Sequence, residues 1–157
     1  MKLKIVTFIA AVLLLAGCAS DKEASTTDTS GGGSGTSSTP GSVEDFQVNV
    51  GDRVFFDYDS YEIRADSQDT LNRQAAWLNQ YGNYAITVEG HCDERGTREY
   101  NLALGERRAN AVRNYLVAQG VDPNRIQTIS YGKERPEVAD SNETAWAQNR
   151  RGVTVLQ

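Results

Sequence analysis

The sequence predicts an α+β fold, a two-layer sandwich in which helices pack on a mixed four-stranded sheet, built as βαβαβ plus a C-terminal strand. Segments rich in strand-forming residues alternate with segments whose apolar residues repeat at helical spacing. Two helical segments separate the first three strands, which implies two crossover connections, normally right-handed. The alternating region, 43–157, is long enough for one hydrophobic core but not for two.

The first strand is expected at 53–57, where Val and Phe are frequent. Residues 66–69 then offer helix-capping side chains, and Gly82 is a plausible helix stop. Between them Leu71, Ala75 and Leu78 recur at helical spacing. This pattern predicts the first crossover helix, and 84–90 reads as the buried strand that follows it.

The clearest helical pattern runs from Leu102 to Leu116, in steps of three and four residues through Gly105, Ala109 and Val112. Gly120 stands just past its end, where helices often stop. These five residues are expected to face the core. The remaining elements are a third strand at 125–130, a short helix at 142–148 and a last strand at 152–156.

Residues 1–17 have the organisation of a lipoprotein signal peptide. Two lysines precede the apolar run 5–16, which is shorter than the roughly 20 residues that a spanning helix needs. The run ends in Leu15-Ala16-Gly17-Cys18, a lipobox pattern that predicts cleavage before Cys18 and acylation of its sulfur. The alternative is an ordinary secretory signal with an incidental cysteine.

Residues 18–42 are expected to be the lipidated cysteine and a flexible linker, and 43–157 the folded domain. Between 19 and 42 the chain is dominated by Ser, Thr and Gly and has no Val, Leu, Ile or aromatic residue. Such a segment buries too little apolar surface to offset the entropy of ordering it. It therefore serves as a tether between the lipid and the domain.

The composition excludes several classes of function. The formal net charge of −5 argues against binding nucleic acid through bulk electrostatics. With His91 as the single histidine, no multi-histidine metal site is expected, and no sequence motif for a cofactor is present. The two cysteines, Cys18 and Cys92, stand in unlike contexts, so we expect Cys92 to be a free, mostly buried thiol.

One segment carries a family resemblance. Residues 90–112 contain seven spaced motif positions: Asp93, Gly96, Asn101, Leu104, Arg108, Ala109 and Val112. Residues 56–60, 130–136 and 149–151 agree with the same pattern. The domain resembles the OmpA-like peptidoglycan-binding domain, and more closely the peptidoglycan-associated lipoproteins. Cys92 departs from that pattern, which has Ala or Thr there, but it removes no ligand-type side chain.

The resemblance implies a ligand site for the diaminopimelate of the peptidoglycan stem peptide. Asp93 follows a strand at its carboxyl end, where open α/β sheets bind ligands. Asn101 and Arg108 are two turns apart and share a helical face, which we expect to flank the core stripe and to be partly exposed. Asp93 would accept from the ligand ammonium and Arg108 would donate to its carboxylate, with Asn101 beside them.

Asp57 is a weaker ligand candidate, and Arg150 and Arg151 are weaker still. Gly96 is expected to serve a turn that needs positive φ. The purely structural alternative is that Asp93 and Arg108 pair with each other and attach a loop to a helix.

By the same resemblance, the chain is expected to be a non-enzymatic lipoprotein of the outer membrane, with its domain in the periplasm. It would tether that membrane to peptidoglycan within the Tol-Pal system, which serves envelope integrity and constriction at cell division. The pattern after Cys18, with Ala19 and not Asp, is associated with outer-membrane sorting. The family also implies TolB as a protein partner.

Three alternatives remain open at this point. The domain could act mainly as a protein-binding module through TolB. It could be a peptidoglycan hydrolase, with Glu89 and Asp93 on one strand face and Glu94 near the turn as the carboxylates. The run His91-Cys92-Asp93 could belong to a metal cluster, although alternation on a strand sends Cys92 to the opposite face.

Overall fold

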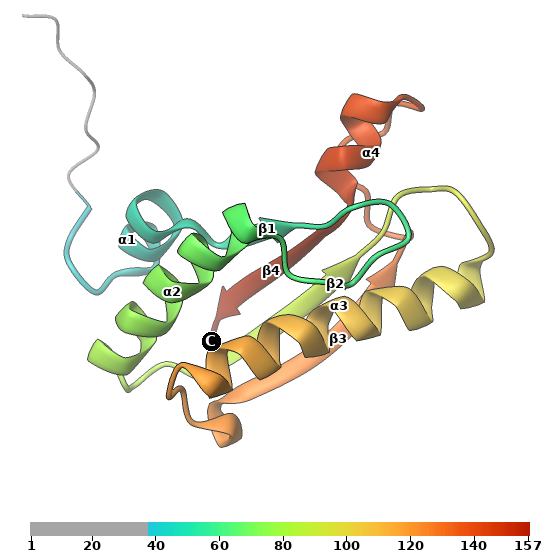
Figure 1. Cartoon of the computed structure of the whole chain (residues 1–157). Coiled ribbons are helices and arrows are strands. Elements are labelled where there is room, and N and C mark those ends of the chain that lie inside the picture. The colour runs from blue at the N-terminus through green and yellow to red at the C-terminus, as the bar shows by residue number, and fades with distance from the viewer. Residues whose placement is uncertain (1–37) are drawn as a thin grey trace, which may run out of the picture. The chain divides into compact units, whose positions relative to one another are not determined.

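The computed structural model describes residues 38–157, which form a four-stranded mixed sheet with two long helices on one face (Figure 1). The strands are β1 (Arg53–Phe55), β2 (Ile86–His91), β3 (Ile126–Gly132) and β4 (Arg151–Leu156). The helices are α1 (Val43–Asp45), α2 (Ala65–Gln80), α3 (Arg98–Ala118) and α4 (Glu143–Asn149), with short helical turns η1 (Phe46–Gly51) and η2 (Pro123–Arg125). The predicted signal peptide, Cys18 and most of the predicted linker lie outside the described residues.

The sheet has the strand order β1-β4-β2-β3, which confirms the predicted mixed architecture. Strands β2 and β3 pair in parallel, whereas β4 is antiparallel to both β2 and β1. Because β1 and β2 are each antiparallel to β4, they run parallel to one another. The carboxyl ends of β1 and β2 therefore lie at the same edge of the sheet as the amino end of β4, and this edge carries the site described below.

Helix α3 lies unusually close to β2, because two glycines face each other there. A Cβ added at Gly90 would stand 1.8 Å from the carbonyl oxygen of Gly105. Any larger side chain at this position would push the helix away from the strand. The helix begins at a capped end, where the Thr97 side chain accepts a hydrogen bond from the backbone N–H of Tyr100. At its far end Gly120 adopts φ +95°, as expected of a residue after a helix stop.

The core between the sheet and its helices is apolar along most of its length. It consists of Phe46, Val54, Phe56, Leu71, Ala75, Trp77, Leu78, Ile86, Val88, Ala109, Val112, Leu116, Val121 and Ile126. The prediction that Leu102 faces this core is wrong, because its side chain is 47% exposed. Here the backbone of α3, and not the side chain, meets the sheet: Ser130 Oγ donates to the Leu102 carbonyl at 2.6 Å.

The start of the fold was incompletely predicted. Phe46, in a π-helical turn without any sequence periodicity, is 1% exposed and packs edge-on against Trp77. Gly41, assigned to the linker from sequence, accepts a hydrogen bond at its carbonyl from Tyr84 Oη at 2.8 Å. The ordered contacts of the domain thus begin slightly before residue 43. In the part of the chain that the structure describes, no helix is long and apolar enough to cross a membrane.

Candidate functional site

A cleft of about 110 Å³ opens at the edge where β1 and β2 end. It lies between the loop that follows β1, the loop that joins β2 to α3, and the first turns of α3. Its lining brings together Asp93, Asn101 and Arg108, the three main residues predicted for ligand binding. The remaining lining residues are Tyr58, Asp59, Cys92, Arg95, Gly96, Tyr100 and Leu104. A cleft of this size suits the end of a side chain and not a whole sugar or drug-sized ligand.

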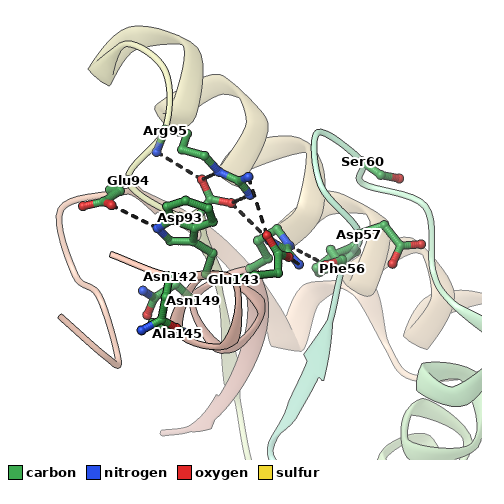
Figure 2. A network of polar contacts seen from close by, with 12 residues as sticks. Phe56, Asp57, Ser60, Asp93, Glu94, Arg95, Asn142, Glu143, Ala145 and Asn149 are labelled. Atoms are coloured by element: carbon green, nitrogen blue, oxygen red, sulfur yellow. Dashed lines mark hydrogen bonds and ion pairs between the residues drawn. The ribbon is translucent and has the colours of Figure 1, made fainter. Parts of the chain in front are cut away.

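Asp93 is 4% exposed and is held by two arginines (Figure 2). Arg95 forms a bidentate pair with it, with Nη2 2.6 Å from Oδ2 and Nε 3.2 Å from Oδ1. Arg150 adds a contact from Nη1 to Oδ2 at 3.3 Å. Burial opposes ionisation of this carboxyl, but the hydrogen bonds from Arg95 and Arg150 and the charge of Arg95 outweigh it and lower its pKa. Asp93 is therefore a carboxylate, and Arg95 is the nearer of its two cationic partners.

The guanidinium of Arg95 lies between two aromatic rings. It stands 4.1 Å from the ring centre of Tyr58 and 4.1 Å from that of Trp146. Trp146 comes from α4 and also donates from Nε1 to Glu94 at 3.0 Å. The sequence analysis did not name Arg95 as a site residue, although it lines the cleft. Its position two residues after Asp93 was the available signal, whereas Trp146 is brought in only by the fold.

Arg108 is fully buried, with 0% of its surface exposed, and the expectation of partial exposure is wrong. Its guanidinium donates to three carbonyl oxygens: Ser60 at 2.8 Å, His91 at 2.8 Å and Asp57 at 3.0 Å. Burial lowers the pKa of Arg108. A guanidinium has five N–H donors, so these three bonds leave part of its capacity for a ligand. Within the described residues Arg108 forms no ion pair with Asp93, which excludes the simple structural pairing considered from sequence.

Asn101 organises the loop that carries Asp93. Its Nδ2 donates to the carbonyls of Arg95 at 2.8 Å and Thr97 at 3.0 Å, and the side chain is 2% exposed. Gly96, within this loop, has φ +90°, which confirms the turn predicted from sequence. Asn101 and Arg108 do share a face of α3, but it is the buried face and not a flanking one.

Arg150 connects three parts of the fold at this edge. In addition to Asp93, it donates from Nε to the Phe56 carbonyl at 3.1 Å and from Nη2 to Glu143 at 2.8 Å. It is 6% exposed and caps the carboxyl end of α4, where a positive charge is favourable. Arg150 thus supports Asp93 from behind, and it does not line the cleft.

The other two weaker candidates lie apart from the cleft. The Asp57 carboxylate, 72% exposed, faces Arg64 at 3.4 Å, and only its carbonyl contacts Arg108. Arg151 points from β4 towards Glu137, with Nη2 3.3 Å from Oε2. Neither side chain contributes to the lining of the cleft.

The carboxylates considered for hydrolysis do not form a catalytic pair. Glu89 lies on β2 beside His91, with 3.3 Å between Oε2 and Nε2, whereas Asp93 lies beyond the end of the strand. Hydrogen bonds from Ser141 and Trp146 lower the pKa of Glu94, and the pKa of Asp93 is also lowered. A glycosidase needs one carboxylic acid whose pKa is raised. Among residues 38–157 no three His, Cys, Asp or Glu side chains are placed to hold a metal.

Cys92 forms part of the cleft floor. It is 2% exposed and donates from Sγ to the Asn101 carbonyl at 3.3 Å. Burial raises the pKa of its thiol to about 11, against the opposing effect of the Arg108 charge. In the described part of the chain Cys92 is a free, buried cysteine, and Cys18 lies outside the described residues.

Comparison with known proteins decides the family. The model of the OmpA family matches residues 55–150. A peptidoglycan-associated lipoprotein of Rhizobium meliloti (strain 1021) is 63% identical over 145 residues, which cover 92% of this chain and 82% of the relative. The chain belongs to the OmpA family, and within it to the peptidoglycan-associated lipoproteins. The name of this relative is that of a lipoprotein and not of an enzyme, in agreement with the non-enzymatic prediction.

A less similar relative and two solved structures agree with this assignment or with the fold. The peptidoglycan-associated lipoprotein of Haemophilus influenzae is 40% identical over 148 residues, covering 93% of this chain and 96% of the relative. The crystal structure of the one from Burkholderia pseudomallei has a TM-score of 0.66 at 43% identity, covering 68% of this chain and 90% of that chain. The C-terminal domain of Helicobacter pylori MotB shares the fold, with a TM-score of 0.63 at 24% identity. The match covers 68% of this chain and 84% of the MotB chain.

Proposed function

We propose that this domain binds peptidoglycan non-covalently, through the side-chain end of diaminopimelate, in the cleft formed by Asp93, Asn101 and Arg108. The observation that carries the proposal is one small cleft lined by both a buried carboxylate and a buried guanidinium. The end of the diaminopimelate side chain carries an ammonium and a carboxylate on one carbon. Opposite charges that line one cleft match that pair.

Binding requires a rearrangement of Arg95. Its guanidinium donates to both oxygens of Asp93, so it occupies the position that the ammonium of a ligand would take. Arg95 itself keeps 28% of its side-chain surface exposed, and can turn towards solvent or towards Glu143, which lies 3.7 Å away. Exchange of one cation for another keeps Asp93 paired throughout, which avoids an uncompensated buried charge.

The ligand itself provides the sharpest test, because removing Arg108 would also disturb the fold. A soluble stem peptide with diaminopimelate is compared by calorimetry with the same peptide containing lysine, which keeps the ammonium and lacks the carboxylate. Loss of one charge-assisted contact typically weakens binding about tenfold to a hundredfold. We expect that loss for the lysine peptide on the wild-type domain.

A matched pair of variants completes the test. Asp93→Asn keeps the shape of the side chain and removes its charge, and should reduce the affinity for the diaminopimelate peptide by a similar factor. Asp66→Asn is the control, since Asp66 also pairs with an arginine, Arg64 at 2.6 Å, but lies outside the cleft. Equal binding of the lysine and diaminopimelate peptides, or normal binding by a folded Asp93→Asn variant, would sink the assignment.

The proposal extends to anchoring. Acylated at Cys18, the chain would be held in the outer membrane with its domain in the periplasm, so that binding in the cleft tethers this membrane to the cell wall. Two or more acyl chains are needed for stable anchoring. Cys18→Ser should release the protein from membranes during fractionation, and a variant that still floats with the outer membrane would contradict this reading of residues 15–18.

The family resemblance supports TolB, of the Tol system, as a protein partner. The rim of the cleft exposes Tyr58 and Tyr100, at 62% and 46%, with Leu102 nearby at 47%. Aromatic residues of this kind are frequent in protein interfaces. A partner docked on this rim would cover the cleft, so saturating stem peptide should weaken binding of TolB. Unchanged affinity for TolB would show that TolB and the stem peptide bind to different surfaces.

A further inference from the structure

A second hollow, of about 310 Å³, adjoins the cleft on the outer side of α3. It is lined by Tyr61, Arg107, Asn110, Ala111 and Asn114. Arg107 links the two hollows, because its guanidinium lies 5.5 Å from the ring centre of Tyr61 and 5.9 Å from that of Tyr100. Tyr100 also lines the cleft. The two hollows are therefore neighbours on one continuous surface.

Among the residues that the structure describes, Arg107 is a cation without an anionic partner. Six arginines of residues 38–157 form ion pairs, namely Arg53, Arg64, Arg95, Arg98, Arg150 and Arg151, and Arg107 is not among them. It is exposed, whereas its neighbour Arg108 is buried beneath the loop at 57–60. Adjacent residues on a helix diverge by about 100°. One of the two guanidinium groups thus points under the loop and the other lies outside it.

The charge of Arg107 reaches the cleft. Together with that of Arg108, it acts to lower the pKa of the Cys92 thiol on the cleft floor, although burial dominates there. It also acts to lower the pKa of Tyr100, which its hydrogen bond to Asp59 raises. These effects fall off with distance, so Arg107 is close enough to act on an anion attached to a ligand in the cleft.

The stem peptide carries such an anion. The D-glutamate before diaminopimelate is linked through its side-chain carboxyl, so its α-carboxylate is free. About ten covalent bonds of roughly 1.5 Å separate this carboxylate from the carbon that bears the distal ammonium. This gives a reach on the order of 10 Å for a bent chain. The Arg107 guanidinium lies 5.9 Å from the ring centre of Tyr100, which lines the cleft.

We infer that Arg107 forms a second subsite, which reads the free α-carboxylate of the D-glutamate that precedes diaminopimelate. This subsite rests on the proposed function, because the diaminopimelate end must occupy the cleft first. Arg107 supplies the charge, and the rings of Tyr61 and Tyr100 hold its guanidinium against the helix. Walls in which this carboxyl is amidated would then be bound less tightly than walls in which it is free.

The experiment compares two soluble tripeptides, L-Ala–γ-D-Glu–diaminopimelate and its α-amidated form, on three proteins. On the wild-type chain, amidation should weaken binding about threefold to tenfold, less than for a buried contact because Arg107 is exposed. Arg107→Gln should bind both forms with the weaker affinity. Arg113→Gln is the control, since Arg113 lies on the same helix, forms no ion pair in residues 38–157 and is outside both hollows.

Each outcome is decisive. If Arg107→Gln discriminates the two tripeptides as the wild type does, or if the wild type does not discriminate them, the subsite is wrong while the cleft assignment stands. If Arg113→Gln also loses discrimination, the effect is one of overall charge and the subsite is again wrong. Failure of the wild type to bind the free-acid tripeptide at all would overturn the proposed function together with the subsite.

Discussion

Arg108 Nη1 donates to the carbonyl oxygen of His91 at 2.8 Å, and this bond joins the middle of α3 to the last residue of β2. The same guanidinium also holds the loop after β1, through Ser60 and Asp57. Arg108, which we assign to the ligand carboxylate, therefore also holds together the segments that form the binding site. Removing it affects stability and binding together, which determines how its role can be measured.

Arg108→Ala should lower the free energy of unfolding by about 3–5 kcal/mol, because it leaves buried carbonyls without donors and a cavity behind. Urea unfolding followed by circular dichroism measures this loss. Arg107→Ala is the matched control, since Arg107 is the next residue on the same helix and is exposed. Similar unfolding midpoints for the two variants would contradict the structural role of Arg108.

Arg95→Gln should raise the pKa of Asp93, because it removes the bidentate pair that holds this pKa low. A carboxyl whose pKa is lower in the folded state stabilises the fold above its unfolded pKa of about 3.9, and this contribution disappears as pH falls through the folded value. The variant should therefore be less stable than wild type above about pH 5, with the difference shrinking towards about pH 2.

Unfolding by urea at a series of pH values measures this difference. Arg98→Gln is the control, because Arg98 pairs with Glu134 at 3.2 Å but both side chains are exposed, at 70% and 50%. Its effect should be small at every pH. A stability difference between wild type and Arg95→Gln that stayed constant across this range would show that Asp93 is not the group involved.

Cys92 should be nearly inert to thiol reagents in the folded protein. Its pKa of about 11 leaves on the order of one thiolate in a thousand at pH 8, and its sulfur is buried as well. In a Cys18→Ser chain, Cys92 is the single thiol, and its rate of reaction with Ellman's reagent can be compared with and without urea. Equal rates in the two conditions would contradict the burial of this residue.

Gly90→Ala should destabilise the domain by about 3 kcal/mol, because the added methyl group meets the backbone carbonyl of Gly105 and no side-chain rotation relieves the clash. Gly82→Ala is the matched control, since a Cβ there has no other atom within 4 Å. Its effect should stay within about 0.5 kcal/mol. Thermal unfolding of both variants tests the close approach of α3 and β2, and equal midpoints would rule it out.

The order and type of the main elements follow from local sequence. The apolar steps from Gly105 to Leu116 predict the buried face of α3, and the alternation of strands and helices predicts the mixed sheet. Gly96 and Gly120 were predicted to stand at a turn and at a helix end, and both have positive φ. These features depend on neighbours within a few residues, which is why periodicity and turn chemistry reveal them.

Other features could not be predicted from the sequence, because they depend on residues far apart in the chain. Arg150 reaches Asp93 across 57 positions, since β4 inserts between β1 and β2 and brings its amino end to the cleft. Trp146 reaches Arg95 for the same reason.

Arg108 falls on a helical position that the pattern assigned to an exposed flank, yet the carbonyl groups of two other segments bury it. By itself the sequence determined which elements form and which residue types could bind a charged ligand. The tertiary structure alone decided which of these charges are buried and which are already paired, because burial and pairing depend on the segments that converge at one edge of the sheet.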